Sequence, residues 1–119
     1  MKKKKILCFD LDNTIGKTRK KFYFESKPIK KAINLINQLY DEGYYIKIYT
    51  GRFMGRNRGD LKKTYKQGYQ FTKKQLKSWN LKFDKLVLGK TPYDLFVDDK
   101  AYGYKKNWYL DYRKYLKKI

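Results

Sequence analysis

Ile6-Leu7-Cys8-Phe9-Asp10-Leu11-Asp12-Asn13-Thr14 is the stretch that decides the fold prediction, because four apolar residues run directly into two carboxylates spaced by one residue. A short apolar run of this kind is typical of a strand buried in a parallel sheet, and such sheets place ligands at the carboxyl ends of their strands. Two carboxylates near a protein interior repel each other and favour a cation between them. The competing interpretation is that residues 12–14 form an ordinary turn or helix cap.

Two later apolar runs also end in polar residues. Residues 45–49 are β-branched and aromatic, and they lead into Thr50-Gly51-Arg52. Residues 94–97 lead into Asp98-Asp99, so four of the 11 acidic residues fall at two predicted strand ends. Because the carboxyl ends of parallel strands share one edge of a sheet, we expect these side chains to converge there.

Four motifs thus follow one another along the chain: Asp10-Leu11-Asp12-Asn13-Thr14, Thr50 after a strand, Lys90, and Asp98-Asp99. Their order resembles the haloacid dehalogenase (HAD) superfamily of phosphatases and phosphotransferases. The stretches around Thr50, Lys90 and Asp98 are also similar to those of small capless members associated with bacterial capsular polysaccharide synthesis. The resemblance spans most of the chain and implies a Mg²⁺-dependent phosphomonoesterase.

The resemblance implies a role for each motif. Asp10 would be the nucleophile that forms an aspartyl-phosphate, and Asp12 would protonate the leaving group and then activate water. Thr50 and Lys90 would complete the catalytic set by binding the phosphoryl group and offsetting its charge. The implied Mg²⁺ ligands are Asp10, the backbone carbonyl of Asp12, Asp98 and Asp99.

Lys90 is one of several lysines that could supply the catalytic charge. The others are Lys82, Lys85 and Lys100, and a solvated loop lysine is the ordinary alternative. We prefer Lys90 because residues 89–92 (Gly-Lys-Thr-Pro) predict a tight connection beside the last strand. The expected substrate-binding residues are Leu11, Thr14, Gly51, Arg52 and Arg56, with Tyr23 and Arg58 as further candidates.

Helical patterns separate the predicted strands. Apolar residues between 29 and 40 recur on one helical face, with Pro28 at the first turn and Gly43 just beyond the end. Thr72-Lys73-Lys74-Gln75 has the form of a capping box and predicts the start of a second helix, which leaves 52–70 as a glycine-containing loop. The remaining predicted elements are a strand over 85–88, a strand over 94–97 and a terminal helix within 107–119.

These elements predict one domain over residues 1–119, an α/β fold with a three-layer Rossmann-like HAD core. We expect a short, mainly parallel sheet with strand order 4-1-2-3, the strands being numbered along the chain. Neither residues 15–27 nor residues 52–70 are numerous enough to form a large cap domain. An open site suits a bulky substrate, unless a neighbouring subunit covers it.

Composition narrows the classes of function. The chain has 119 residues, one cysteine and no histidine. The lack of histidine excludes the usual zinc-hydrolase ligand sets and histidine-based acid–base catalysis. No apolar run approaches the length of a membrane span, and the lysine-rich start lacks the apolar region of a signal peptide. We therefore expect a cytoplasmic protein with no membrane partner.

The net charge of +20 can be interpreted in two ways: as a surface that binds nucleic acid, or as a consequence of amino-acid composition. A basic domain with 13 Tyr, 7 Phe and 2 Trp could bind single-stranded nucleic acid, either without catalysis or as a polynucleotide 3′-phosphatase. However, only 5 of the 31 cationic residues are arginine, which nucleic-acid readers favour for bidentate contacts, so the charge is better explained by composition. We favour a phosphorylated sugar or a nucleotide-sugar-linked or glycan-linked phosphate as substrate. A homo-oligomer, in which a neighbouring subunit covers the site, is compatible with the sequence.

Overall fold

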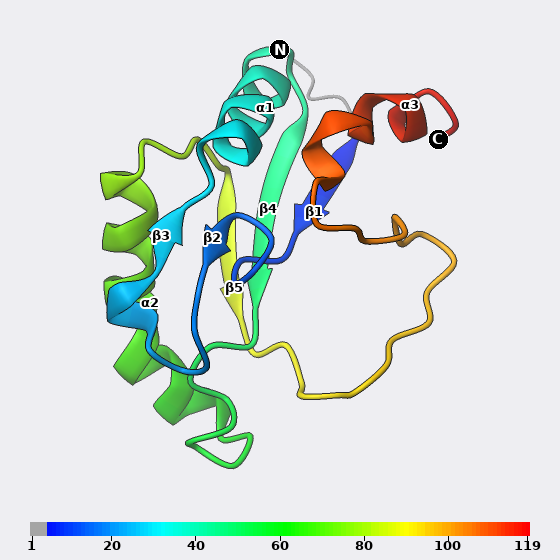
Figure 1. Ribbon diagram of the computed structural model, residues 1–119. Helices are drawn as coiled ribbons and strands as arrows, with labels where there is room; N and C mark the ends of the chain where they lie inside the picture. Colours follow the sequence, from blue (N-terminus) through cyan, green and yellow to red (C-terminus); the bar gives the residue numbers. More distant parts are fainter. Residues whose placement is uncertain (1–4) are drawn as a thin grey trace.

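The computed structural model describes residues 5–119 and has an α/β fold around a three-stranded parallel sheet (Figure 1). The strands lie in the order β1 (Ile6–Phe9), β4 (Tyr45–Thr50) and β5 (Lys85–Leu88). Phe9 lies beside Ile48, and Thr50 lies beside Leu88. The three strands predicted over these residues are confirmed, and their carboxyl ends lie at the same edge of the sheet.

Helix α1 (Lys30–Asp41) is the predicted crossover between β1 and β4. It follows Pro28 and ends before Gly43, which adopts a positive φ of 100°. Such a conformation favours glycine at the end of a helix. The buried face of the helix consists of Ala32, Ile33, Leu35, Ile36 and Leu39, which confirms the predicted periodicity.

A small hairpin lies between β1 and α1. It consists of β2 (Gly16–Lys17), the 3-10 turn η1 (Tyr23–Glu25) and β3 (Lys27–Pro28), and β2 pairs antiparallel with β3. No large cap domain is evident within residues 5–119.

Helix α2 (Leu61–Ser78) is longer than the sequence pattern predicts. Its N-cap is Asp60, whose carboxylate accepts a hydrogen bond from the Lys63 amide. The capping-box interpretation at Thr72 is therefore wrong, and part of the expected 52–70 loop is helical. The buried residues of α2 are Thr64, Gly68, Thr72 and Leu76. Three of these four are not strongly apolar, so hydrophobic periodicity does not detect this face.

Gly68 marks a close contact between α2 and the loop after β4. A Cβ atom at this position would lie 2.3 Å from Cδ2 of Phe53, so the helix could not approach the loop with any larger residue. None of the helices in residues 5–119 is both long and apolar enough to cross a membrane.

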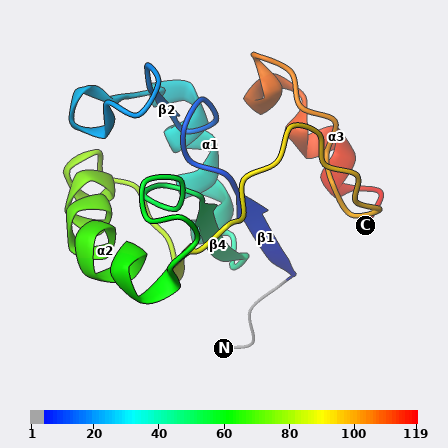
Figure 2. The same cartoon turned by 90° about the horizontal axis from the view of Figure 1, so that it is seen from below.

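The two faces of the sheet differ in burial. One face is buried and includes Leu7, Ile46 and Leu86, which belong to the main hydrophobic core together with residues of α1. The other face has no buried residue: it carries Ile6, Cys8, Tyr45, Lys47, Tyr49, Lys85 and Val87. Figure 2 shows α1 on one side of β1 and β4 and no described helix on the other. The described residues therefore form two layers and not the three that we expected.

The predicted fourth strand is absent from the described structure. Residues 94–97 form no strand, and the side chains of Leu95 and Val97 are 86% and 90% exposed. The sheet order is therefore that of strands one, two and three of the prediction, with one edge of β1 unpaired. A strand forms only when its backbone groups find a partner ladder, and this segment runs away from the sheet (Figure 1).

The terminal region is only partly helical. It contains the 3-10 turn η2 (Trp108–Leu110) and the short helix α3 (Tyr112–Leu116), in place of one helix through 107–119. Trp108 is buried, and its ring lies 5.5 Å from that of Phe9. The end of the described chain thus packs onto β1.

Candidate active site

Three strand ends meet at the carboxyl edge of the parallel sheet. Asp10 follows β1, Thr50 ends β4 and Lys90 follows β5. The Lys90 amide donates to the Thr50 carbonyl oxygen over 3.2 Å, which ties the ends of β4 and β5 together. Lys90 Nζ lies 3.6 Å from Asp10 Oδ1. Of the lysines considered from the sequence, Lys90 is thus the one that forms an ion pair with Asp10.

The Asp10 carboxylate is partly buried between its neighbours. Its Oδ2 accepts a hydrogen bond of 3.3 Å from the Thr14 hydroxyl. Burial raises the pKa of Asp10, although the positive charge of Lys90 opposes the shift. Burial lowers the pKa of Lys90, but contacts with Tyr93 and Asp10 outweigh it, so the pKa is raised overall. A carboxyl with a raised pKa beside a fixed cation is typical of a functional site.

Gly51 allows the ends of β4 and β5 to approach each other. A Cβ atom at this position would lie 2.9 Å from the Lys90 carbonyl oxygen, so any larger residue would displace the loop that carries Lys90. The neighbouring Thr50 is buried, and its Oγ1 accepts the Arg52 amide hydrogen over 3.1 Å. The Thr50 hydroxyl still has its own proton to donate.

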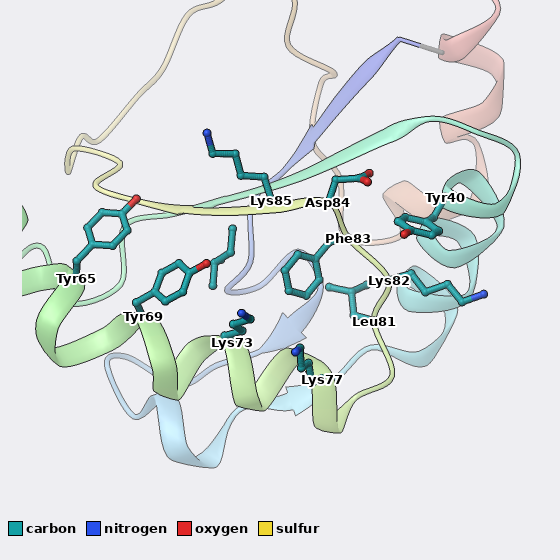
Figure 3. Close-up of a pocket in the computed structure, with 11 residues that line it drawn as sticks. Tyr40, Tyr65, Tyr69, Lys73, Lys77, Leu81, Lys82, Phe83, Asp84 and Lys85 are labelled. Carbon is teal, nitrogen blue, oxygen red and sulfur yellow. The ribbon is translucent and has the colours of Figure 1, made fainter. Parts of the chain in front are cut away.

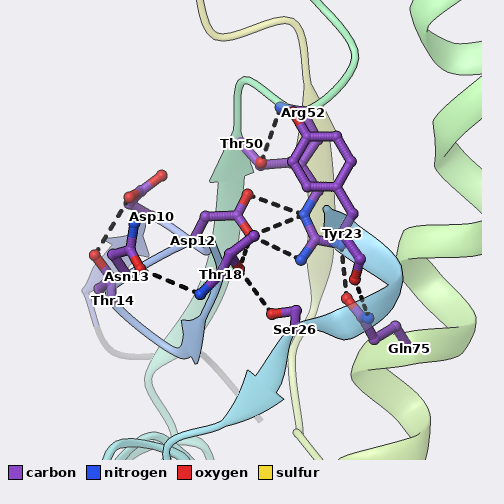
Figure 4. A network of polar contacts seen from close by, with 10 residues as sticks. All are labelled: Asp10, Asp12, Asn13, Thr14, Thr18, Tyr23, Ser26, Thr50, Arg52 and Gln75. Atoms are coloured by element: carbon purple, nitrogen blue, oxygen red, sulfur yellow. Dashed lines mark hydrogen bonds and ion pairs between the residues drawn. The ribbon is translucent and has the colours of Figure 1, made fainter. Parts of the chain in front are cut away.

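Asp12 points away from Asp10 and into a polar network (Figure 4). Its Oδ1 accepts hydrogen bonds from Arg52 Nη2 at 2.8 Å, Arg52 Nε at 3.1 Å and the Thr18 hydroxyl at 2.5 Å. Its Oδ2 accepts one from Arg52 Nε at 2.9 Å. Oδ2 therefore accepts one hydrogen bond, whereas Oδ1 accepts three.

Arg52 is the centre of this network. Its side chain has no exposed area, and its Nη1 donates to Gln75 Oε1 over 2.7 Å. Gln75 Nε2 in turn donates to the Tyr23 carbonyl oxygen over 2.8 Å, and the Tyr23 ring lies 4.8 Å from Arg52 Cζ. We expected Arg52 to contact substrate. In this structure its buried guanidinium holds Asp12, and the contact with substrate stays a prediction.

The other residues expected to contact substrate differ in their burial and in their distance from Asp10. The Leu11 side chain is fully buried, so only its backbone can face a ligand. Thr14 is half-buried and contacts Asp10. Arg56 is exposed, with its guanidinium 4.5 Å from the Phe53 ring centroid and 5.7 Å from that of Tyr23. Arg56 therefore lies beside the hairpin and not in the Asp10 cluster.

The loop after β1 is held from the far end of the chain. Trp108 Nε1 donates to the Thr14 carbonyl oxygen over 2.9 Å, and the Tyr104 hydroxyl donates to the Asn13 carbonyl oxygen over 2.7 Å. These two bonds fix the backbone of the loop that carries Asp10 and Asp12.

Asp98 and Asp99 are not part of the assembled cluster. Both are exposed, and Asp98 Oδ1 accepts the Lys100 amide hydrogen over 3.0 Å. This backbone hydrogen bond, followed by one with Asp99, lowers the pKa of Asp98. Among residues 5–119, no group of three or more acidic, cysteine or histidine side chains could hold a metal ion. The expected Mg²⁺ site of Asp10, the Asp12 backbone carbonyl, Asp98 and Asp99 is therefore not formed in this structure.

Several residues of the site have no local signal in the sequence. Thr18 binds Asp12 and is itself hydrogen bonded to Ser26 over 2.7 Å. Gln75 reaches the site from α2, and the rings of Tyr49 and Tyr93 lie 5.9 and 5.5 Å from Lys90 Nζ. Their roles depend on which elements pack together, so a motif search does not find them.

Comparison with known proteins supports the fold and says little about the chemistry. No family model matches the chain, and no curated protein matches it. The fold is similar to that of a structural genomics target from Vibrio cholerae, whose crystal structure superposes with a TM-score of 0.77. The match covers 83% of this chain and 83% of that chain at 24% sequence identity. At this identity the similarity shows a shared fold alone.

Proposed function

We propose that the protein is a Mg²⁺-dependent phosphomonoesterase of the HAD type, acting through an aspartyl-phosphate. The observation that carries the proposal is the contact between Asp10 and Lys90 at an edge where three parallel strands end. A nucleophile, a cation and a hydroxyl, here that of Thr50 at the end of the neighbouring strand β4, are what phosphoryl transfer requires, since catalysis there is mainly positioning and charge stabilisation.

In this proposal a carboxylate oxygen of Asp10 attacks phosphorus, and the bond from phosphorus to the leaving oxygen breaks. Asp12 enters this step in its protonated form and gives that proton to the departing alkoxide through Oδ2, its less engaged oxygen. Asp12 then takes a proton from the water that hydrolyses the aspartyl-phosphate, which releases phosphate and restores Asp10. Lys90 offsets negative charge on Asp10 and on the phosphoryl group throughout.

The donor set of residues 10–12 fits Mg²⁺ in part. The Asp10 carboxylate and the Asp12 backbone carbonyl would provide oxygen ligands, which this ion prefers. Bound there, Mg²⁺ would neutralise phosphoryl oxygens and orient the phosphate. A complete site needs Asp98 and Asp99 as well, and the proposal therefore requires residues 94–99 to move toward Asp10.

Both ends of the acidic segment are already attached to the site. Lys90 precedes it and pairs with Asp10, while Tyr104 follows it and bonds to the Asn13 carbonyl oxygen. The apolar run over 95–97 is exposed, and one edge of β1 has no partner strand among residues 5–119. We propose that this run pairs with that edge when Mg²⁺ binds, which would give the sheet order 4-1-2-3.

The proposed substrate is a phosphorylated sugar or a glycan-linked or nucleotide-sugar-linked phosphate, as in the polysaccharide-synthesis members that the sequence resembles. The insertion between β1 and α1 is no larger than the β2–β3 hairpin, so no large cap within the described residues covers the site, and an open site supports a bulky substrate. A polynucleotide 3′-phosphatase is the second candidate. It is supported by Phe22 and Phe24 of the hairpin, which are 48% and 82% exposed, and by Arg19, whose Cζ lies 5.1 Å from the Phe22 ring centroid.

The test is phosphate release from a panel of sugar phosphates, nucleotide-sugar conjugates and a 3′-phosphorylated oligonucleotide, with and without Mg²⁺. Asp10→Asn should reduce the rate at least ~10³-fold while the circular dichroism spectrum is unchanged, because a neutral amide cannot act as this nucleophile. Asp41→Asn is the matched control, since Asp41 pairs with Lys82 outside the site and should retain wild-type activity. Equal rates for Asp10→Asn and wild type would refute the proposal.

A further inference from the structure

A pocket of about 670 Å³ lies between α2 and the start of β5 (Figure 3). We call it the α2–β5 pocket. Lys85 begins β5 and lines this pocket, whereas Lys90 follows the other end of the strand and contacts Asp10. The pocket is therefore separate from the candidate active site. Its volume falls within the roughly 300–1,000 Å³ of small-ligand sites.

One wall of the pocket consists of preorganised aromatic rings. The Tyr65 hydroxyl accepts the Leu88 amide hydrogen over 3.0 Å and lies 3.3 Å from the Leu88 carbonyl oxygen, which fixes its ring against β5. The Tyr69 ring stacks on that of Tyr65 at 5.7 Å with an angle of 19° between the planes. Tyr69 and Phe83 are half-buried and point into the space between α2 and β5.

The floor of the pocket is apolar and its lower wall is cationic. Leu81 and Leu86 are buried beneath it. Lys73 and Lys77 lie one turn apart on α2, and Lys73 Nζ is 5.9 Å from the Tyr69 ring centroid. Within residues 5–119, neither lysine forms an ion pair, and the two like charges share one face of the helix.

The lining residues of the pocket carry an excess of positive charge, with one carboxylate, Asp84, against Lys73, Lys77, Lys82 and Lys85. Asp84 Oδ2 accepts the Ile46 amide hydrogen over 2.8 Å, which holds this carboxylate at the sheet. Lys82 Nζ pairs with Asp41 at 2.8 Å. The pocket therefore combines stacked rings with a positive charge that an anion would offset, which is the pattern that binds a base and its phosphate.

We propose that the α2–β5 pocket binds a nucleoside phosphate, with the base against Tyr69 and Phe83 and the phosphate on Lys73 and Lys77. The ligand is a free mononucleotide or one nucleotide of a single strand, since both present the same chemistry. This site is independent of the proposed phosphatase reaction, because none of its side chains belongs to the Asp10 cluster.

The experiment is a titration of the full chain with AMP, adenosine and ribose 5-phosphate, followed by amide chemical shifts at physiological ionic strength. The Asp10→Asn background without Mg²⁺ keeps the candidate active site from consuming the probes. AMP should bind more tightly than either fragment and shift amides in 65–77 and 83–86. Lys73→Gln/Lys77→Gln should weaken AMP binding ~10-fold, and Tyr69→Leu should abolish the preference for AMP over ribose 5-phosphate.

Lys66→Gln/Lys74→Gln is the control, because both lysines are exposed on α2, lie outside the pocket and change the net charge equally. It should keep AMP affinity within about twofold. An oligoadenylate identifies the source: tighter binding than AMP at the same amides indicates a strand, and equal or weaker binding indicates a free nucleotide. Equal losses in the two double variants, no preference for AMP over ribose 5-phosphate, or shifts confined to residues 10–14 would overturn the proposal.

Discussion

The edge formed by β1, β4 and β5 and the segment over 91–103 both carry functional residue types, but they differ in what holds them. At the edge, the backbone hydrogen bonds of the parallel sheet hold the chain as far as the strand ends that precede Asp10 and Lys90. Lys90 Nζ lies 3.6 Å from Asp10 Oδ1. In the segment, Asp98 and Asp99 have no strand or helix around them, and every residue over 91–100 is exposed.

Electrostatics explains why the two regions differ. The edge already holds Asp10 and Asp12, each offset by one cation, Lys90 and Arg52 respectively. Moving Asp98 and Asp99 beside them would bring four carboxylates together, which repel one another unless a divalent cation binds. The comparison teaches that backbone pairing alone brings Asp10 and Lys90 together, whereas in the proposed site the acidic segment joins them only when a metal ion binds.

The largest expected effect tests the difference between the two regions by replacing one carboxylate of the segment over 91–103. Asp98→Asn should lower Mg²⁺-dependent phosphate release roughly 100-fold, because the proposed metal loses a carboxylate ligand. The same change should leave stability without Mg²⁺ within about 0.5 kcal/mol, since Asp98 is exposed in this structure. Activity assays and urea unfolding in EDTA measure the two effects. Unchanged activity would show that the segment is not part of the site.

The second prediction concerns stability at the assembled edge. Arg52→Met should cost about 2–4 kcal/mol of unfolding free energy, because it leaves the partly buried Asp12 carboxylate without its cation. Arg113→Met is the matched control: Arg113 also binds a carboxylate, Glu42, at 2.6 Å, but in solvent. Its cost should be about 0–1 kcal/mol. Equal costs in urea unfolding would contradict a special role of the Arg52 network.

The smallest expected effect is a pH dependence at Asp10. Burial raises the pKa of Asp10 above its ordinary 3.8, so the folded state binds the proton more tightly than the unfolded chain does. Its contribution to stability is thus complete below pH 3.8 and is lost as the pH rises through the raised pKa. In EDTA, Asp10→Asn should therefore melt roughly 2 °C above wild type at pH 7, with the gap closing below the ordinary pKa. A gap that widened in acid would contradict the sign of this shift.

Much of the edge could be predicted from sequence because its signals are local. Apolar runs ending in polar residues located β1 and β4, and the periodicity over 29–40 located α1. The contact between Lys90 and Asp10 was predicted from the family resemblance, together with the tight connection that residues 89–92 indicate.

The remaining features depend on contacts between distant elements. The buried face of α2 contains Thr64, Gly68 and Thr72, which carry no apolar pattern. From the sequence, Arg52 is indistinguishable from a surface cation. Its role depends on contacts with Asp12 and Gln75, which lie on other elements. The apolar run over 95–97 has the composition of a strand, but composition cannot show whether a partner edge is occupied.

The most direct test of the account is paramagnetic broadening by Mn²⁺ in place of Mg²⁺, read from backbone amide signals. If the metal assembles the two regions, signals of residues 10–14 and of residues 96–100 should broaden over the same range of Mn²⁺ concentration. Both effects should disappear in Asp10→Asn, and Leu95→Ser/Val97→Ser should weaken the broadening at 96–100. Broadening confined to residues 10–14 in the wild-type protein would contradict the account, because the acidic segment would then not join the metal site.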